Sequence, residues 1–321
     1  MQLDRLWAVL AALLVAAPAG AETYPSHPIR LVVPYPPGTS TDLLARQVMP
    51  KAVERLGQPV VIDNRGGAGG IIGAELVAKA TPDGYTLVFA TSQTHAINIS
   101  LYPKLPYDPQ AQFAPVARVG SQPLVLVVPP SLGIDTPAAL VALAKRRPGQ
   151  LNYASTGSGT SAHLAGELLK SGTGVDIAHV PYKSASQAIG DLLAGQVSMM
   201  LYPYAPLEGQ IAAHSLRTLA TTGAQRAAFL PDVPTMVEAG FPTVVLSAWY
   251  AVYAPAGTPP AIVATLNAAI VAAIAEPDVR AAMLATGTEP GPSTQDELGA
   301  FTTAEIARYR ELIRRSGATV D

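Results

Sequence analysis

Two stretches of sequence decide how this chain folds: VPYPPGTSTD at residues 33–42 and YASTGSGTSAH at residues 153–163. Each follows an apolar, strand-like run and precedes a helix-like run. Each is rich in Gly, Ser and Thr and contains no Lys or Arg. Such a loop leaves backbone N–H groups unpaired at the start of a helix, where the helix dipole favours an anion. Two such loops, far apart in sequence, predict one anionic ligand, a carboxylate or a phosphate, held from two sides.

Strand-like and helix-like segments alternate along most of the chain. The expected strands lie at 29–33, 59–62, 85–90, 124–128, 151–154, 177–180, 197–201, 216–221 and 247–255. Among the expected helices are 41–56, 71–80, one that starts at Thr136-Pro137, 260–275, and 294–316, which opens with a capping box of Thr294 and Glu297. This βαβ pattern predicts an α/β protein with a mainly parallel sheet covered on both faces.

The strands fall into two groups, which predicts two lobes. We expect residues 22–122 and 248–321 to form lobe 1 and residues 123–247 to form lobe 2. The chain then crosses twice between the lobes. Two crossings make a hinge, and a cleft between two lobes is a preferred ligand site.

The first 21 residues have the pattern of a secretory signal peptide. Arg5 precedes the apolar run Leu6 to Ala17, and a small-x-small pattern predicts cleavage after Ala21. A non-cleaved anchor is the alternative, but the run is shorter than the roughly 20 residues of a membrane span. The chain has no Cys, which excludes a lipoprotein anchor, disulfides and thiolate metal sites. These features indicate the bacterial periplasm.

Composition and motifs argue against several functions. Only 14% of residues are charged and the formal net charge is −2, so no basic field attracts nucleic acid or an acidic membrane surface. The P-loop, HExxH and GxSxG signatures are missing, and the five His residues show no ligand spacing. We therefore expect no metal and no cofactor. The sequence GSGTSA at 157–162 fits a dinucleotide-binding loop, but the next strand ends without the acidic residue that holds a ribose.

Some residues admit two interpretations. Ser92 and His95 follow the strand 85–90, at an edge where α/β proteins bind ligands, or they serve as loop and cap residues. Asp42 is a helix cap or dipole partner rather than a catalytic acid. The glycine-rich run 64–70 either lines the cleft or makes a tight turn. Trp249 and Tyr250 either line the cleft or pack at the hinge.

The chain resembles a known family. The motifs that carry this resemblance span nearly all of the chain after the predicted signal peptide. They are YP at 24–25, PYPPG at 34–38 with Asp42, VIDNR at 61–65, GAGG at 67–70, PDGYTL at 82–87, LPYDP at 105–109, LNYAS at 151–155, HVPYK at 179–183, LPDVPT at 230–235 and APAGTP at 254–259. The chain is similar to the Bug family of periplasmic receptors, the TctC-like solute-binding proteins of tripartite tricarboxylate transporters.

The resemblance implies a two-lobed, Venus-flytrap (type II-like) fold that closes on a small carboxylate. It implies that loop amides, hydroxyls and bridging waters hold the acid, without Arg or Lys. The expected partners are the carboxylate and the membrane components of the transporter, with the receptor a monomer that performs no chemistry. The candidate ligand-binding residues are Tyr35, Pro37, Gly38, Thr39, Thr41, Asp42, Ser92, His95, Thr156, Ser158, Gly159, Thr160, Ser161, His163 and Tyr202. A sensing subunit for a membrane kinase and a secreted hydrolase using a loop Ser are the alternatives.

The chain departs from the family pattern in two places. Thr39 stands where the first loop usually has a second Gly, so a β-carbon and a hydroxyl enter the loop. Ser198 and Tyr202 stand where the family usually carries acidic residues. We infer that the ligand lacks an ammonium group and is an aromatic or aliphatic carboxylate rather than an amino acid.

Overall fold

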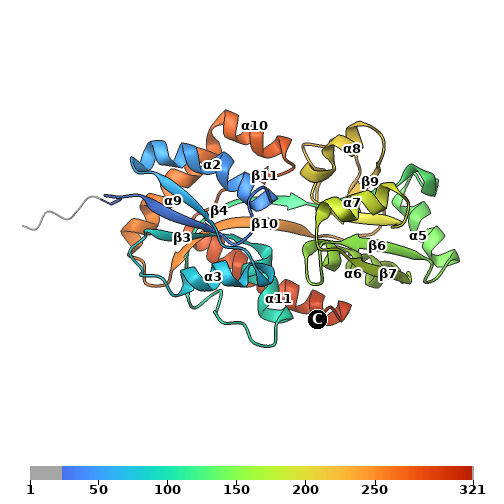
Figure 1. Cartoon of the computed structure of the whole chain (residues 1–321), viewed down its shortest axis with the longest axis horizontal. Coiled ribbons are helices and arrows are strands. Elements are labelled where there is room, and N and C mark those ends of the chain that lie inside the picture. Colours follow the sequence, from blue (N-terminus) through green and yellow to red (C-terminus); the bar gives the residue numbers. More distant parts are fainter. Residues whose placement is uncertain (1–23, 320–321) are drawn as a thin grey trace, which may run out of the picture.

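The structure is a computed structural model that describes residues 24–319. The signal peptide expected over residues 1–21 lies outside the described residues. The strands gather into two sheets that lie side by side along the long axis of the molecule (Figure 1).

The first sheet has six strands. Their order is β11 (Glu289–Pro290), β4 (Phe113–Pro123), β10 (Ser247–Pro255), β3 (Thr86–Thr91), β1 (Ile29–Val33) and β2 (Val60–Asn64). β1 pairs in parallel with β2 and β3, with Ile29 opposite Val60. β10 runs antiparallel to both β3 and β4 and lies between them.

The second sheet has five strands. Their order is β7 (Ile177–Pro181), β6 (Leu151–Ser155), β8 (Met199–Tyr202), β5 (Val125–Val128) and β9 (Arg217–Thr221). β6 is parallel to β7 and β8, while β5 is antiparallel to β8 and β9. Both sheets are therefore mixed, and the prediction of a mainly parallel sheet is wrong. β5 follows β4 of the other sheet, and β10 follows β9 of the other sheet after a loop that contains no helix. A βαβ crossover therefore does not fix the direction of either strand.

Helices cover the sheets in the positions that the sequence predicts, with additions. Their bounds are α2 (Ser40–Leu56), α3 (Ile71–Ala78), α4 (Asn98–Leu101), α5 (Pro137–Arg146), α6 (Ser161–Thr173), α7 (Ala185–Leu193), α8 (Glu208–Ala212), α9 (Pro260–Ala275), α10 (Pro277–Ala285) and α11 (Gln295–Ser316), with short turns η1 (Ala68–Gly70), η2 (Gln93–Ile97), η3 (Pro130–Leu132) and η4 (Ala205–Leu207). The Thr136 cap with Pro137 in the first turn is confirmed, as is the capping box of Thr294 and Glu297.

The apolar helix α9 is a core helix of the first sheet. It contacts α2 and β4, and Leu266, Ile270 and Ile274 on it are buried. Among the described residues no single helix is long and apolar enough to cross a membrane. α9 and α10 would be long enough together, but a bend of 73° separates them.

The C-terminal helix α11 joins the two halves. It contacts β4 and η2 on the side of the first sheet and α6 on the side of the second (Figure 1). Ile306 and Leu312 of α11 belong to one buried cluster with Ile97 and with Leu164 of α6. A fully buried side chain of this size stabilises the fold by about 1.5–3 kcal/mol. A continuous apolar core therefore holds the two halves together on the side of α11.

Candidate functional site

A cavity of ≈ 1220 Å³ lies between the two halves of the molecule. Residues from both sheets line it, and they come largely from the segments that follow β1, β3, β6, β7 and β8. Hydroxyl groups dominate its polar lining. They belong to Thr39, Ser40, Thr41, Thr91, Ser92, Thr156, Ser158, Thr160, Ser161, Ser184 and Ser186 together with Tyr35, Tyr102, Tyr202 and Tyr250. The described lining residues include one cation, Lys183, and no carboxylate.

The first predicted loop brings the start of α2 to the cavity. The N-cap residue Thr39 has φ −73°, so an L-residue fits at this position without strain. Its hydroxyl makes no cap bond to the helix and donates instead to the Pro36 carbonyl, at 2.9 Å. The N–H groups of Ser40, Thr41 and Asp42, in the first turn of α2, have no acceptor within their own helix. They are therefore suited to an anion in the cavity.

Asp42 supports this loop from behind and does not line the cavity. Its carboxylate accepts hydrogen bonds from the Gly38 N–H at 2.9 Å, from Asn64 Nδ2 at 3.0 Å and from Arg46 Nε at 3.0 Å. Burial alone would raise the pKa of Asp42, but these hydrogen bonds outweigh it and hold the pKa below its ordinary value. Asp42 is thus an ionised residue that fixes the loop backbone.

The second predicted loop brings the start of α6 to the opposite side. Thr156, Ser158, Thr160 and Ser161 line the cavity. Gly159 does not, because it packs against Leu101 of α4, with φ +78°. A Cβ on Gly159 would lie 2.0 Å from Leu101 Cδ2, so only Gly allows this approach. His163 is also buried behind the loop, and its Nδ1 accepts the Gly159 N–H at 2.9 Å.

A third helix, α7, also begins at the cavity, and sequence reasoning missed it. Lys183, Ser184 and Ser186 line the cavity from the N-terminal end of this helix. Ser184 caps α7 by accepting the Gln187 N–H. A Ser followed three residues later by Gln is a helix-start signal, so the sequence did contain a clue. Lys183 is exposed. It was not predicted at the site, because the two predicted ligand loops contain no Lys or Arg.

Buried tyrosines supply neutral hydrogen-bond donors. The hydroxyl of Tyr35 lies 3.0 Å from Thr91 Oγ1, and burial raises the pKa of Tyr35 to about 12. Burial also raises the pKa of Tyr202. Both phenols therefore stay protonated at neutral pH and can donate to a carboxylate.

Strand alternation separates Trp249 from Tyr250, which the sequence could not do. Tyr250 faces the cavity and donates to Gln122 Oε1 at 2.7 Å. Trp249 points to the other face of β10, where it packs on Phe301 and donates to Glu305. The glycine-rich run takes both of its possible roles, since Gly67, Gly69 and Gly70 have positive φ and also line the cavity.

The structure places ten of the candidate residues at the cavity and five away from it. At the cavity are Tyr35, Gly38, Thr39, Thr41, Ser92, Thr156, Ser158, Thr160, Ser161 and Tyr202. Away from it are Pro37, Asp42, His95, Gly159 and His163. His95 is fully buried, stacked on Tyr253 with ring centroids 4.3 Å apart, and burial lowers its pKa to about 3.

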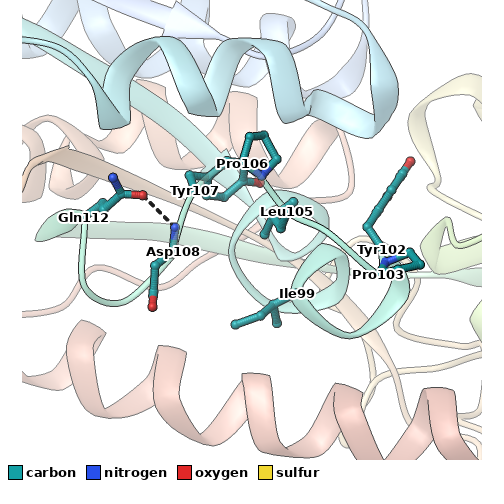
Figure 2. Close-up of a pocket in the computed structure, with 8 residues that line it drawn as sticks. All are labelled: Ile99, Tyr102, Pro103, Leu105, Pro106, Tyr107, Asp108 and Gln112. Carbon is teal, nitrogen blue, oxygen red and sulfur yellow. Dashed lines mark hydrogen bonds between the residues drawn. The ribbon is translucent and has the colours of Figure 1, made fainter.

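A smaller hollow of ≈ 450 Å³ lies in the loop between α4 and β4 (Figure 2). Its polar groups bond to one another, since Gln112 Oε1 accepts the Asp108 N–H at 2.7 Å and the Asp108 carboxylate accepts the Gln110 and Ala111 N–H groups. The Asp108 charge disfavours an anion there. The larger cavity is therefore the candidate functional site.

Two mixed α/β halves around a cavity lined by hydroxyls and helix starts define a two-lobed solute-binding protein. Comparison with known proteins places the chain further. The profile of the "Tripartite tricarboxylate transporter family receptor" family, TctC, matches residues 44–318, and the chain belongs to this family. Its members are solute-binding receptors, which confirms the predicted family, the two-lobed fold and a non-enzymatic role.

Three relatives illustrate the similarity. Protein BugT of Bordetella pertussis is 41% identical over 323 residues, which cover 99% of each chain. The R. palustris protein Rpa4515, solved with adipate, is 36% identical with a TM-score of 0.85, covering 93% of this chain and 100% of its own. MatC of Rhodopseudomonas palustris, solved with bound malate, is 31% identical with a TM-score of 0.80, covering 90% of this chain and 100% of its own.

Proposed function

We propose that this protein is a periplasmic receptor that captures a small organic carboxylate in the cavity between its lobes. Residues 22–122 and 248–321 would form one lobe and residues 123–247 the other. The observation that carries the proposal is the convergence of the N-termini of α2, α6 and α7 on one hydroxyl-lined cavity. Oriented N–H groups and helix dipoles bind an acid group without a buried cation.

The ligand would be a carboxylate without an ammonium group. An ammonium in a protein site normally faces a carboxylate, and the described lining residues offer none. Tyr202 lines the cavity and presents a neutral phenol. Ser198 bonds to Asn152 outside the cavity. Tyr250, Pro203, Pro206 and Ile189 add apolar surface that suits a carbon skeleton.

A thermal-shift screen tests this function. The panel would contain adipate, malate, citrate and benzoate beside glutamate and aspartate. At a concentration 100-fold above Kd, a ligand stabilises the folded state by about 2.7 kcal/mol. We expect one or more of the acids without an ammonium group to raise Tm by several degrees, because binding adds to the free energy of unfolding.

Calorimetry on the same panel ranks the affinities. Glutamate or aspartate as the tightest ligand would contradict the inference about the missing ammonium group. A panel in which no acid changes Tm would contradict carboxylate capture itself.

We further propose that the closed receptor delivers its acid to the membrane components of a tripartite tricarboxylate transporter. The family profile and the receptors among the relatives support this role. Immobilised protein, with and without the tightest acid of the screen, would be incubated with detergent-solubilised membranes. Retention of transporter subunits only with the acid is the expected result, and retention of a sensor kinase instead would favour the sensing alternative.

A further inference from the structure

The two ligand loops have the same local construction. Their sequences are GTSTDL at residues 38–43 and GTSAHL at residues 159–164. The glycine has φ +78° in both, and the N-cap residues have φ −73°, ψ 159° in Thr39 and φ −68°, ψ 160° in Thr160. Each Thr hydroxyl donates to the carbonyl three residues earlier, at 2.9 Å in the first loop and 2.8 Å in the second.

The glycine N–H is fixed in the same manner in both loops. Gly38 N–H donates to Asp42 Oδ2 at 2.9 Å, and Gly159 N–H donates to His163 Nδ1 at 2.9 Å. In both cases the acceptor is the third residue of the helix, four positions after the glycine. The two acceptors differ in their chemistry. A carboxylate accepts a hydrogen bond whenever it is ionised, whereas an imidazole nitrogen accepts one only while it carries no proton.

The hydrogen bond to Gly159 defines the protonation state of His163. Nδ1 presents its lone pair to a backbone N–H, so the ring is neutral in this loop conformation. A proton on Nδ1 would face the Gly159 N–H, donor against donor. It would also place a positive charge in the first turn of α6, where the helix dipole disfavours a cation.

The stacked ring of His179 adds to this preference for the neutral ring. His179 of β7 stacks on it with ring centroids 4.0 Å apart, so two imidazolium ions would repel each other. Tyr153 of β6 stacks at 6.4 Å and donates its hydroxyl proton to Glu167, which also accepts from Lys170.

Two carboxylates of the neighbouring helix α11 have hydrogen-bond partners of their own. α11 packs against α6, and its Glu305 accepts from Trp249 and Arg308, while Glu311 accepts from Arg314 and Arg315. His163 itself bonds directly to the second ligand loop, at the Gly159 N–H.

His179 is a less sensitive neighbour. Its Nε2 lies 2.6 Å from Ser155 Oγ, and that hydroxyl donates its proton to the Gly157 carbonyl. While the hydroxyl proton is directed at the Gly157 carbonyl, Nε2 of His179 is the donor to Ser155. A further proton on the other nitrogen leaves this hydrogen bond in place, which is not true of the bond between His163 and Gly159.

We propose that His163 is a positioning residue that makes the second ligand loop, and with it carboxylate affinity, sensitive to acid. The inference rests on the proposed function. When His163 takes up a proton at Nδ1, the bond to Gly159 is lost and the first-turn N–H groups of α6 leave their orientation toward the cavity. The first loop keeps the hydrogen bond between the Gly38 N–H and Asp42, because hydrogen bonds hold the pKa of Asp42 below its ordinary value.

The test has a ligand-free arm and a binding arm. In the ligand-free protein, NMR would follow the His163 imidazole nitrogens and the Gly159 amide proton between pH 8 and pH 5. We expect Nδ1 to be unprotonated at pH 8 and the Gly159 amide to shift with the midpoint of the His163 titration. Calorimetry would follow adipate over the same range, with a Kd that rises by up to tenfold per pH unit below that midpoint.

Two variants separate the effect of the hydrogen bond between Gly159 and His163 from general effects of acid. His163→Asn supplies a neutral acceptor that does not titrate, and His163→Asp copies the acceptor of the first loop. Both should flatten the dependence of adipate Kd on pH, whatever the affinity at pH 8. His179→Asn should retain a one-proton slope, because the bond between Gly159 and His163 remains.

The outcomes distinguish a failure of the His163 inference from a failure of the proposed carboxylate function. A Gly159 amide that ignores the His163 titration, a Kd that falls on acidification, or an unchanged pH profile in both His163 variants would overturn the inference. A protein that binds no adipate at any pH would count against the proposed carboxylate function in that arm. The NMR arm still decides the inference, by co-titration or its absence.

Discussion

The contact between Gly159 and Leu101 gives a sharp test at the scale of single residues. Gly38 and Gly159 share φ +78°, but a Cβ on Gly38 meets nothing within 4 Å whereas one on Gly159 meets Leu101. Gly38→Ala should cost about 1–2 kcal/mol of unfolding free energy for its left-handed backbone. Gly159→Ala should cost about 1–3 kcal/mol more, from overpacking.

Urea unfolding of both variants measures this difference. In the background of Leu101→Ala, which itself removes a buried side chain, Gly159→Ala should cost less than it does in the wild-type protein, because the atom that the new Cβ meets is gone. Equal losses in the two glycine variants would show that the approach between the second loop and α4 is not tight.

His95 predicts a pH dependence of stability. Burial lowers its pKa in the folded protein to about 3, while the unfolded imidazole titrates near 6.5. Below pH 6.5 the unfolded state therefore binds more protons, and stability falls as the pH falls. The slope from this residue is about 1.4 kcal/mol per pH unit. His95→Gln should remove it in unfolding curves between pH 6.5 and pH 4, and identical slopes in the two proteins would contradict the buried neutral ring.

At the scale of elements, Lys183 at the start of α7 discriminates between capture by amides and capture by a cation. An exposed ion pair is worth about 0.2–1 kcal/mol. If the helix starts supply most of the binding, Lys183→Gln should weaken binding of the tightest acid from the screen by less than about fivefold, with a reduced dependence on salt. Calorimetry at two ionic strengths measures both effects, and a loss of a hundredfold would assign the acid group to Lys183.

The elements with strong local signals could be predicted from sequence. β10 has the predicted bounds 247–255 because a run of Trp, Tyr and Val ends at Pro255, and α9 has the predicted bounds 260–275. β4 was missed, because Pro115, Gly120 and Pro123 interrupt its pattern. Its long antiparallel pairing with β10 is a tertiary contact that no local signal reports. α10, at 277–285, was also missed.

The candidate site was predictable where loops carry their own chemistry. The two Gly-Ser-Thr loops lie at the cavity as expected, because a strand followed by a helix start places them at the sheet edge. His95 and His163 are close in sequence to residues that line the cavity, but their side chains do not line it. His95 stacks on Tyr253, and His163 accepts a hydrogen bond from the Gly159 N–H. Local sequence does not determine such orientations, and the same holds for the lining residues of α7.

At the scale of the whole molecule, the crossings and α11 define what can move. One crossing occurs at Leu124, between β4 and β5, and the other enters β10 at Ser247. The cavity of ≈ 1220 Å³ is larger than a small acid needs, so we expect the halves to close by rotation about the crossings. The buried cluster around α11 should persist on that side.

Small-angle scattering measures this closure. With a saturating acid from the screen, the radius of gyration should fall while the far-ultraviolet circular dichroism stays the same. Tight binding with an unchanged radius of gyration would mean that the halves are already closed or do not rotate.

The most direct test of the central claim is a crystal structure with the tightest acid of the screen. We expect a carboxylate oxygen within hydrogen-bond distance of first-turn N–H groups of α2 or α6, with hydroxyls of Thr39, Thr156 or Thr160 beside it. A carboxylate clasped by Lys183 or by an arginine, or bound outside this cavity, would contradict the account.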